Sequence, residues 1–402
     1  MGIVKKLGVG LLILVGIALV AVLAVAPGIV DASFNTINEK RLGDPGPEAA
    51  RLHASAFIAD LHSDSLLWKR DLTVRNNRGH VDFPRLREGN VAFQVFSVVT
   101  KSPKGQNYHS NSGDTDNITA LAMVGLWPPK SWFSLEERAH YQANKLKDFL
   151  GRLKRNKQDA SLITTAEQFV TLASKREAGK TALGTLLALE GAHCLEGDLD
   201  AIDRLFDAGY RMVGLAHFFD NELAGSAHGI DKHGLTEFGT SAMERFEALE
   251  MIIDLAHSSP KTISDVLSRA TRPVVVSHGG VRGTCDSPRN LSDRQLTALA
   301  KNGALIGIGY WPGAICKASP EAFARAMHYA ASRIPVTHLA LGSDFDGSTR
   351  TPIDTSELAL LTEALLSAGF GPREVRAILG GNARRFFAQW LPGGSKKGPE
   401  TL

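Results

Sequence analysis

Short apolar runs recur along most of the chain, separated by stretches whose apolar positions have helical spacing. Eight of these runs fit buried strands, because each is continuous, rich in branched residues and bounded by polar or turn-forming residues. They begin at Phe57, Ala92, Thr185, Arg211, Met251, Pro273, Ala304 and His338. The stretches between them, such as LDAIDRLFDAG and SPKTISDVLSRA, fit amphipathic helices. Eight alternating units predict an α/β fold, a closed (β/α)8 barrel of the TIM type.

A different hydrophobic pattern occupies the N-terminus, where no charged residue interrupts the run from Leu7 to Val30. The run matches the roughly 20 residues that span a hydrocarbon core. It follows Lys5 and Lys6, which favours a cytoplasmic N-terminus. We therefore predict that residues 1–30 form a hydrophobic helix that anchors the chain in a membrane. The main domain would then lie outside the cytoplasm, on the periplasmic or extracellular side. A cleaved signal peptide, followed by secretion, is the alternative.

The remaining segments divide by composition. Residues 31–50 mix polar residues with Gly and Pro and are expected to form a linker, and residues 393–402 a flexible tail. The barrel domain is thus predicted to cover residues 51–392. Within it, the polar stretch from Lys101 to Ser134, which contains Trp-Pro-Pro, is expected to be a long loop after the second strand.

Charge and cysteine content limit the classes of partner. The chain has 45 Lys and Arg against 42 Asp and Glu, a formal charge of +3, without a dense basic tract. Such a pattern is not typical of nucleic-acid binding, so we expect no nucleic-acid partner and a small-molecule substrate instead. The three cysteines are widely spaced, which excludes a disulfide framework and a CxxC metal ribbon.

Polar residues close six of the eight predicted strands. In a (β/α)8 barrel the active site forms at the carboxyl ends of the strands. A single His or Asp at such a position is more often structural. Six such strand ends favour one shared site. The residues concerned are His62, Asp64, Glu190, His217, His257, His278 and Asp344.

Imidazole and carboxylate ligands without thiolates are typical of catalytic zinc. His62 and Asp64 lie two positions apart at a strand end, so they face the same side and can bind one ion. His257 and His278 close successive strands and can bind a second ion. Glu190 can then bridge the two, so we predict two Zn²⁺ ions per chain. A bridging hydroxide between them would attack an amide carbonyl, which makes the barrel a metal-dependent hydrolase.

Proton transfer and substrate binding require further residues. Asp344, in GSDFDG at the end of the last strand, can take a proton from the attacking water and deliver it to the leaving amine. Asp346 is the local alternative, although organising the turn fits it better. Arg289 has the chemistry to hold a substrate carboxylate. Because Arg282 and Arg294 lie close by, spacing alone does not single it out.

At these residues the sequence resembles the membrane (renal) dipeptidase family of zinc peptidases, in a bacterial-type form, from about Phe57 to Ala388. The segments that carry the resemblance are ADLHSDSLL, ALEGAHCLEG, GLAHFFDNELAG, IDLAHSSPKTI, PVVVSHGGVR, SPRNLSD and LGSDFDG. The resemblance implies the same five metal ligands. It also implies that His217 and Arg289 contact the substrate and that Asp344 is the catalytic acid/base residue beside the bridging Glu190.

The resemblance further implies hydrolysis of L-L and also L-D dipeptides, and a homodimer as a common assembly. The segment FFDNELAGSAHG after His217 departs from the animal pattern, which leaves the substrate preference open. The alternative is a related two-metal amidohydrolase, a deacylase or lactonase acting on another small amide or lactone. In such enzymes the first metal-binding motif is commonly His-x-His, and a carboxylated lysine bridges the metals. This chain instead has His-x-Asp at the first motif and Glu190 as the bridging candidate. A non-catalytic barrel protein is disfavoured because all five ligands are present.

Overall fold

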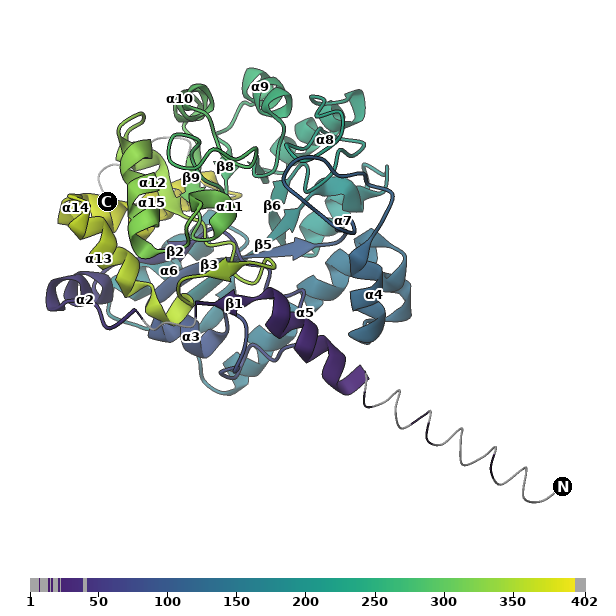
Figure 1. The fold of residues 1–402 in the computed structure, drawn as a ribbon, viewed down its shortest axis with the longest axis horizontal. Helices are drawn as coiled ribbons and strands as arrows, with labels where there is room; N and C mark the ends of the chain where they lie inside the picture. Colours follow the sequence, from purple (N-terminus) through teal and green to yellow (C-terminus); the bar gives the residue numbers. More distant parts are fainter. Residues whose placement is uncertain are drawn as a thin grey trace.

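A closed parallel barrel forms the centre of the protein (Figure 1). The computed structural model describes residues 7, 14, 16, 21, 23–38 and 42–394. Over these residues the sheet order is β3-β2-β10-β9-β8-β7-β6-β5, and β3 also pairs with β5, which closes an eight-stranded barrel. The barrel strands are β2 (Ile58–Asp60), β3 (Val91–Val99), β5 (Leu183–Glu190), β6 (Tyr210–Gly214), β7 (Ile252–Asp254), β8 (Val275–Val276), β9 (Leu305–Ile308) and β10 (Leu339–Leu341). Each coincides with a predicted strand, so the predicted (β/α)8 barrel is confirmed.

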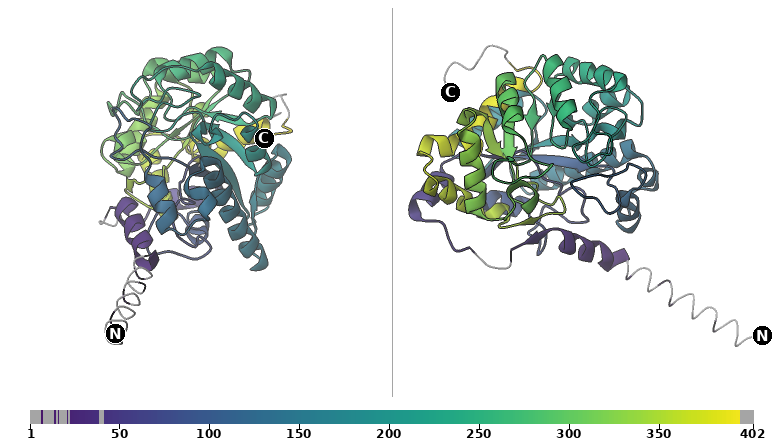
Figure 2. Two further views of the ribbon diagram at one scale, coloured as in Figure 1. Left: turned by 90° about the vertical axis from the view of Figure 1, so that its right-hand side faces the viewer. Right: turned by 45° about the horizontal axis from the view of Figure 1, so that its top comes forward.

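Helices connect the strands and surround the barrel (Figure 2). The helices are α2 (Pro47–Ala54), α3 (Phe83–Glu88), α4 (Asn117–Val124), α5 (Leu135–Arg155), α6 (Ala166–Glu177), α7 (Ala201–Asp207), α8 (Glu237–Ala248), α9 (Pro260–Arg269), α10 (Asp293–Asn302), α11 (Pro312–Ile315), α12 (Pro320–Ala331), α13 (Ala359–Ser367), α14 (Pro372–Arg376) and α15 (Asn382–Trp390). Shorter helical turns are η1 (Pro129–Trp132), η2 (Ala192–Leu195), η3 (Val336–His338), η4 (Thr355–Glu357) and η5 (Ala377–Gly381). Several helices begin where the sequence supplies a cap: the side chains of Ser134, Ser259 and Ser292 accept backbone hydrogen bonds at α5, α9 and α10.

The barrel interior is a packed core. Phe93 on β3 contacts Phe169 of α6 and Phe387 of α15, with ring centroids 5.0 and 4.8 Å away. Inward-facing residues of the other strands, such as Met212 and Ile252, belong to the same buried cluster. A short strand, β4 (Ala160–Leu162), pairs with the start of β5. Apolar side chains therefore fill the barrel, and polar groups concentrate at the carboxyl ends of its strands.

The N-terminal segment packs against the barrel. Residues 23–34 are helical, and the following β1 (Thr36–Ile37) pairs in parallel with β11 (Arg350–Thr351) (Figure 1). Residues 31–50, expected as a linker, thus contain the end of this helix, β1 and the start of α2. In the described part of the chain we find no helix whose length and hydrophobicity would let it cross a membrane. Of the predicted anchor, all but residues 7, 14, 16, 21 and 23–30 lie outside the described residues, as do residues 395–402 of the predicted tail.

Two further features differ in detail from the sequence-based expectations. The stretch from Lys101 to Ser134 is not one continuous loop, because it contains α4 and η1. A single disulfide joins Cys285, after β8, to Cys316, after α11, whereas Cys194 is a buried free thiol. The odd cysteine count excluded a framework, but it gave no means of predicting this one pair.

Candidate metal centre

The five predicted metal ligands converge at the carboxyl end of the barrel. The Oε1 atom of Glu190 lies 3.5 Å from His62 Nε2, 3.1 Å from His257 Nε2 and 3.4 Å from His278 Nε2. Asp64 Oδ2 lies 3.4 Å from His62 Nε2. Barrel closure therefore brings residues from the ends of three other strands around the Glu190 carboxylate.

The atoms at the centre of this cluster fit a divalent cation. Within the described part of the chain, His62 Nε2 and Asp64 Oδ1 are buried without a hydrogen-bond partner. His257 Nε2 faces His278 Nε2 at 3.1 Å. Buried polar atoms normally have partners, so unpartnered imidazole and carboxylate atoms that face one point are suited to metal coordination.

Three groups of side chains each place their ligand atoms within 4.8 Å of one another. The groups are His62, Asp64 and Glu190; Glu190, His217 and His257; and His62, Asp254 and His278. The first is the predicted first site. Glu190 and His62 each belong to two groups. The predicted second pair, His257 and His278, is divided between two groups, although their Nε2 atoms lie 3.1 Å apart.

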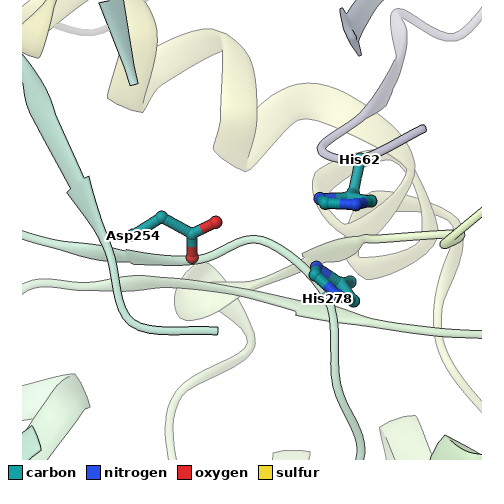
Figure 3. Close-up of side chains that lie close together, drawn as sticks. All are labelled: His62, Asp254 and His278. Carbon is teal, nitrogen blue, oxygen red and sulfur yellow. The ribbon is translucent and has the colours of Figure 1, made fainter. Parts of the chain in front are cut away.

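Asp254, at the end of β7, is a site residue that the sequence analysis did not select (Figure 3). Its carboxylate accepts hydrogen bonds from the Ser277 hydroxyl and from two backbone N–H groups. Ser277 Oγ also lies 2.9 Å from His278 Nδ1 and 3.3 Å from His62 Nδ1. Because the single hydroxyl hydrogen is donated to Asp254, Ser277 can accept from both rings. This arrangement leaves the Nε2 lone pair of each ring for the centre of the cluster.

Burial and charge set the protonation of the cluster. Burial raises the pKa of Glu190 well above its usual value, and the Asp64 carboxylate adds to the rise. Burial lowers the pKa of His257 and His278, which favours the neutral imidazole that binds metals. For His62, burial opposes the charged form, but the three nearby carboxylates, of Asp64, Glu190 and Asp344, outweigh it and raise the pKa to about 10. The surroundings of His62 therefore favour a positive charge, and a bound cation would supply that charge.

Asp344 and Asp346 lie in different surroundings. Asp344 is 8% exposed, has a left-handed backbone with φ of +58°, and places Oδ1 3.9 Å from His62 Nε2. Burial raises the pKa of Asp344 to about 8. Asp346 instead forms an ion pair with Arg70, whose Nη2 lies 2.7 Å from Oδ2, and accepts a hydrogen bond from the Ser65 hydroxyl at 2.6 Å. Although burial opposes ionisation, the Arg70 guanidinium holds the pKa of Asp346 well below its usual range. This contrast favours a structural role for Asp346 and leaves Asp344 available for chemistry.

The two predicted substrate contacts lie on the wall of a cavity of about 840 Å³ above the cluster. His217 Nε2 is 3.5 Å from Glu190 Oε1, and burial lowers its pKa to about 4. Arg289 is buried and donates from Nη2 to the backbone carbonyl of His278 at 2.7 Å. Among the described residues its Nε has no hydrogen-bond partner, so donors remain for a ligand in the cavity.

Aromatic residues that the sequence analysis did not select also line this cavity. Trp311 Nε1 donates to Tyr108 Oη at 2.9 Å, which joins the loop after β3 to the end of β9. The Phe218 ring lies 5.1 Å from the His257 ring. Trp311 follows an apolar strand and had the same strand-end signal as the histidines, whereas Tyr108 lies in a polar stretch that gives no such signal.

Comparisons with known proteins show which family and which solved structures the chain resembles. The sequence profile of the family described as "Membrane dipeptidase (Peptidase family M19)" matches residues 47–390. Dipeptidase 3 of Mus musculus is 27% identical over 353 residues, which cover 83% of this chain and 64% of the mouse protein. The chain thus spans somewhat less than two thirds of that relative's length.

Solved structures share the fold. The crystal structure of the dipeptidase AC, a metallopeptidase of family M19, has a TM-score of 0.67 and 23% identity, covering 84% of this chain and 99% of that one. A metallopeptidase from Rhodobacter sphaeroides, liganded with a phosphinate mimic of the dipeptide L-Ala-D-Ala, has a TM-score of 0.66 and 22% identity. That match covers 83% of this chain and 98% of the other. These two likenesses establish the barrel fold.

Proposed function

This chain belongs to the membrane dipeptidase family, peptidase family M19, and from that premise we propose that it is a metal-dependent hydrolase of dipeptides. The observation that carries the proposal is the convergence of five buried His, Asp and Glu side chains in one cluster beside the cavity. The substrate is a small peptide, since the cavity is lined by one chain and lies in the size range of about 300–1,000 Å³ typical of small-molecule sites.

We propose two zinc ions as the cofactor. His62 and Asp64 would hold one ion, His257 and His278 the other, and Glu190 both, as the distances around its Oε1 atom allow. Nitrogen and oxygen ligands without thiolates fit zinc with an open coordination position. When bound, such a pair supplies a nucleophilic water near neutral pH and polarises the scissile carbonyl.

The remaining residues would move protons and orient the substrate. Asp344 takes a proton from the attacking water and gives it to the leaving amine nitrogen. Its pKa of about 8 suits a group that must change protonation near neutral pH. His217, beside Glu190, contacts the scissile carbonyl, and Arg289 binds the carboxylate of the carboxyl-terminal residue. Because neither role depends on the configuration of that residue, we propose that both L-L and L-D dipeptides are substrates.

We also propose that a membrane anchor lies within residues 1–30, with the barrel on the periplasmic or extracellular side; residues 23–30 themselves belong to the helix that packs against the barrel. The proposal is supported by the uncharged run from Leu7 to Val30 after two lysines. A homodimer, implied by the family resemblance, stays a prediction, as do the domain bounds at residues 30, 50 and 392.

A substrate screen tests the proposed function. The purified chain, with and without added zinc, is assayed against L-L and L-D dipeptides, N-acyl amino acids and lactones. We expect dipeptide hydrolysis that is abolished by a chelator and restored by zinc. Hydrolysis of N-acyl amino acids or lactones without dipeptide hydrolysis would replace the dipeptidase proposal by the deacylase or lactonase alternative.

Arg289→Ala is expected to raise KM by about 10- to 100-fold for free dipeptides, the range for a lost charge-assisted hydrogen bond. Little change is expected for dipeptides with an amidated carboxyl terminus, which lack the charge that Arg289 binds. Steady-state kinetics with both substrate types measure the difference. Arg282→Ala is the matched control, because Arg282 lies nearby but is exposed. An equal effect of Arg289→Ala on both substrate types would contradict the carboxylate-binding role.

Ser277→Ala is expected to weaken zinc binding by about 10- to 100-fold, the usual effect of losing a group that orients metal-binding histidines. The variant removes the acceptor that fixes the Nδ1 side of His62 and His278. Competition with a chromophoric chelator measures the affinity. In Ser258→Ala, the control, the hydroxyl removed is buried but has no hydrogen-bond partner among the described residues. Equal zinc affinity in the two variants would rule out the orienting role.

A further inference from the structure

The cavity above the metal centre has two chemically different ends. One end contains the charged and histidine side chains described above. The other end is apolar and is built from three separate segments of the chain. Its principal residues are Pro27, Val30, Phe34, Trp68, Ile118 and Leu121. Four of them, Val30, Trp68, Ile118 and Leu121, belong to or pack against a small apolar cluster that is separate from the barrel core.

The apolar end lies across the barrel from Arg289. α4, which contributes Ile118 and Leu121, follows β3, whereas Arg289 follows β8. In the closed order, three strands separate β3 from β8 in either direction, so the two strands are opposite each other. A dipeptide whose carboxylate binds Arg289 and whose peptide bond lies at the metal centre therefore directs its amino-terminal residue toward the apolar end.

The helix at residues 23–34 forms one wall of this end. Val30 packs against the apolar cluster, and the Phe34 ring stacks on Trp68 with centroids 6.4 Å apart. Pro27 is buried, whereas Ile29 on another side of the same helix is 63% exposed. The helix therefore presents one face to the cavity.

Buried polar contacts hold the helix in place. The Asp31 carboxylate, 1% exposed, lies 3.0 Å from both Arg70 Nε and Arg78 Nε. The Asn35 side-chain carbonyl accepts from the backbone N–H of Ser348 at 3.0 Å. Arg70 also binds Asp346, so the helix is tied to the loop that carries Asp344. On the opposite wall, the N-cap of α4, Asp116, binds the buried Arg138 at 2.6 Å. Both walls are thus fixed parts of the folded protein.

We propose that the helix at residues 23–34, α4 and Trp68 form a subsite for a bulky apolar side chain on the amino-terminal residue of the substrate. The inference rests on the proposed dipeptidase function and names the substrate class of the same site. The helix precedes the segment matched by the family profile, which begins at residue 47, so this preference is a property of the chain beyond the family match. Burial of a Phe or Leu side chain there removes apolar surface from water, whereas a glycine gains nothing.

The test compares kcat/KM of the zinc-loaded full-length chain for Phe-Ala and Gly-Ala. We expect the wild-type ratio to be at least about 10, within the range of discrimination that an apolar pocket provides. Val30→Trp fills the subsite and is expected to lower this ratio by about tenfold. Ile29→Trp adds the same side chain at the neighbouring exposed position and is expected to leave the ratio unchanged.

The outcomes separate the two proposals. A wild-type ratio near one, or an unchanged ratio in folded Val30→Trp, would overturn the subsite while leaving the dipeptidase function in place. Absence of hydrolysis of either dipeptide by the wild-type chain would instead overturn the proposed function. If Val30→Trp does not fold, Leu121→Gln tests the subsite from α4. A lowered ratio in that variant supports the subsite, and an unchanged one overturns it.

Discussion

Asp344→Asn is expected to lower kcat by about 10²- to 10⁴-fold, the usual contribution of a positioned acid/base group, without loss of bound metal. The amide has nearly the shape of the carboxyl group but cannot exchange a proton with the attacking water or the leaving amine. The matching shape is important because the loop is tightly packed around this side chain. A Cβ atom added at Gly347 would lie only 2.2 Å from Asp344 Oδ1. Steady-state kinetics and metal content by mass spectrometry measure the two effects.

Asp346→Asn is the matched control, because it makes the same change two residues away. The Asp346→Asn substitution removes one partner of a buried ion pair with Arg70, so we expect a lower melting temperature. The kcat of the folded, metal-loaded variant should change much less than in Asp344→Asn. Loss of metal in Asp344→Asn would make Asp344 a ligand, and retained turnover would exclude it as the acid/base residue.

The strands and the residues that close them could be predicted from the sequence, for one physical reason. Strands of a parallel barrel are buried on both faces and therefore form nearly continuous apolar runs. A polar residue at the end of such a run stands out, as His62 and His278 do. Because barrel closure brings all strand ends together, residues more than two hundred positions apart in the sequence could be assigned to one site, and the structure places their rings 3.7 Å apart.

The groups that orient these residues were harder to predict, although a signal existed. Asp60 and Asp254 are acids inside otherwise apolar strands, in IADLH and IIDLAH, shortly before a site histidine. Their function depends on hydroxyl groups from neighbouring strands: Ser343 Oγ donates to Asp60 at 2.9 Å, and Ser277 donates to Asp254. Which serine meets which acid is set by strand order and register, and the pattern of one strand does not contain that information.

The N-terminal wall of the cavity could not be predicted, because an apolar run does not show whether it packs against lipid or against protein. Residues 23–30 are apolar on every side, which favours lipid around them. The structure nevertheless places Pro27 and Val30 on the cavity. Transfer from water favours lipid and a protein interior alike. The polar residues that decide the matter, Asp31 and Asn35, lie at the edge of the run, where composition suggested a linker.

His257→Ala is expected to fold, to lose bound metal and to lower kcat by at least about 10³-fold, because metal ions supply several kcal/mol of transition-state stabilisation. His257 Nε2 is 3.1 Å from both Glu190 Oε1 and His278 Nε2, so the substitution removes a ligand atom that lies between two others. Its φ of +62° lies in the left-handed region. Alanine tolerates this region less well than asparagine, so His257→Asn is the second variant.

Comparing these two variants separates coordination from backbone strain. If the imidazole acts as a ligand, both lose metal, whichever residue suits the backbone better. If strain is the cause, only His257→Ala is affected. His53→Ala is the control for removing a buried imidazole, since both His53 ring nitrogens are hydrogen-bonded, to Thr362 and to the carbonyl of Gly89. It should lose stability and keep two ions. Two bound ions with undiminished turnover in both His257 variants would show that the converging histidines do not form the metal site.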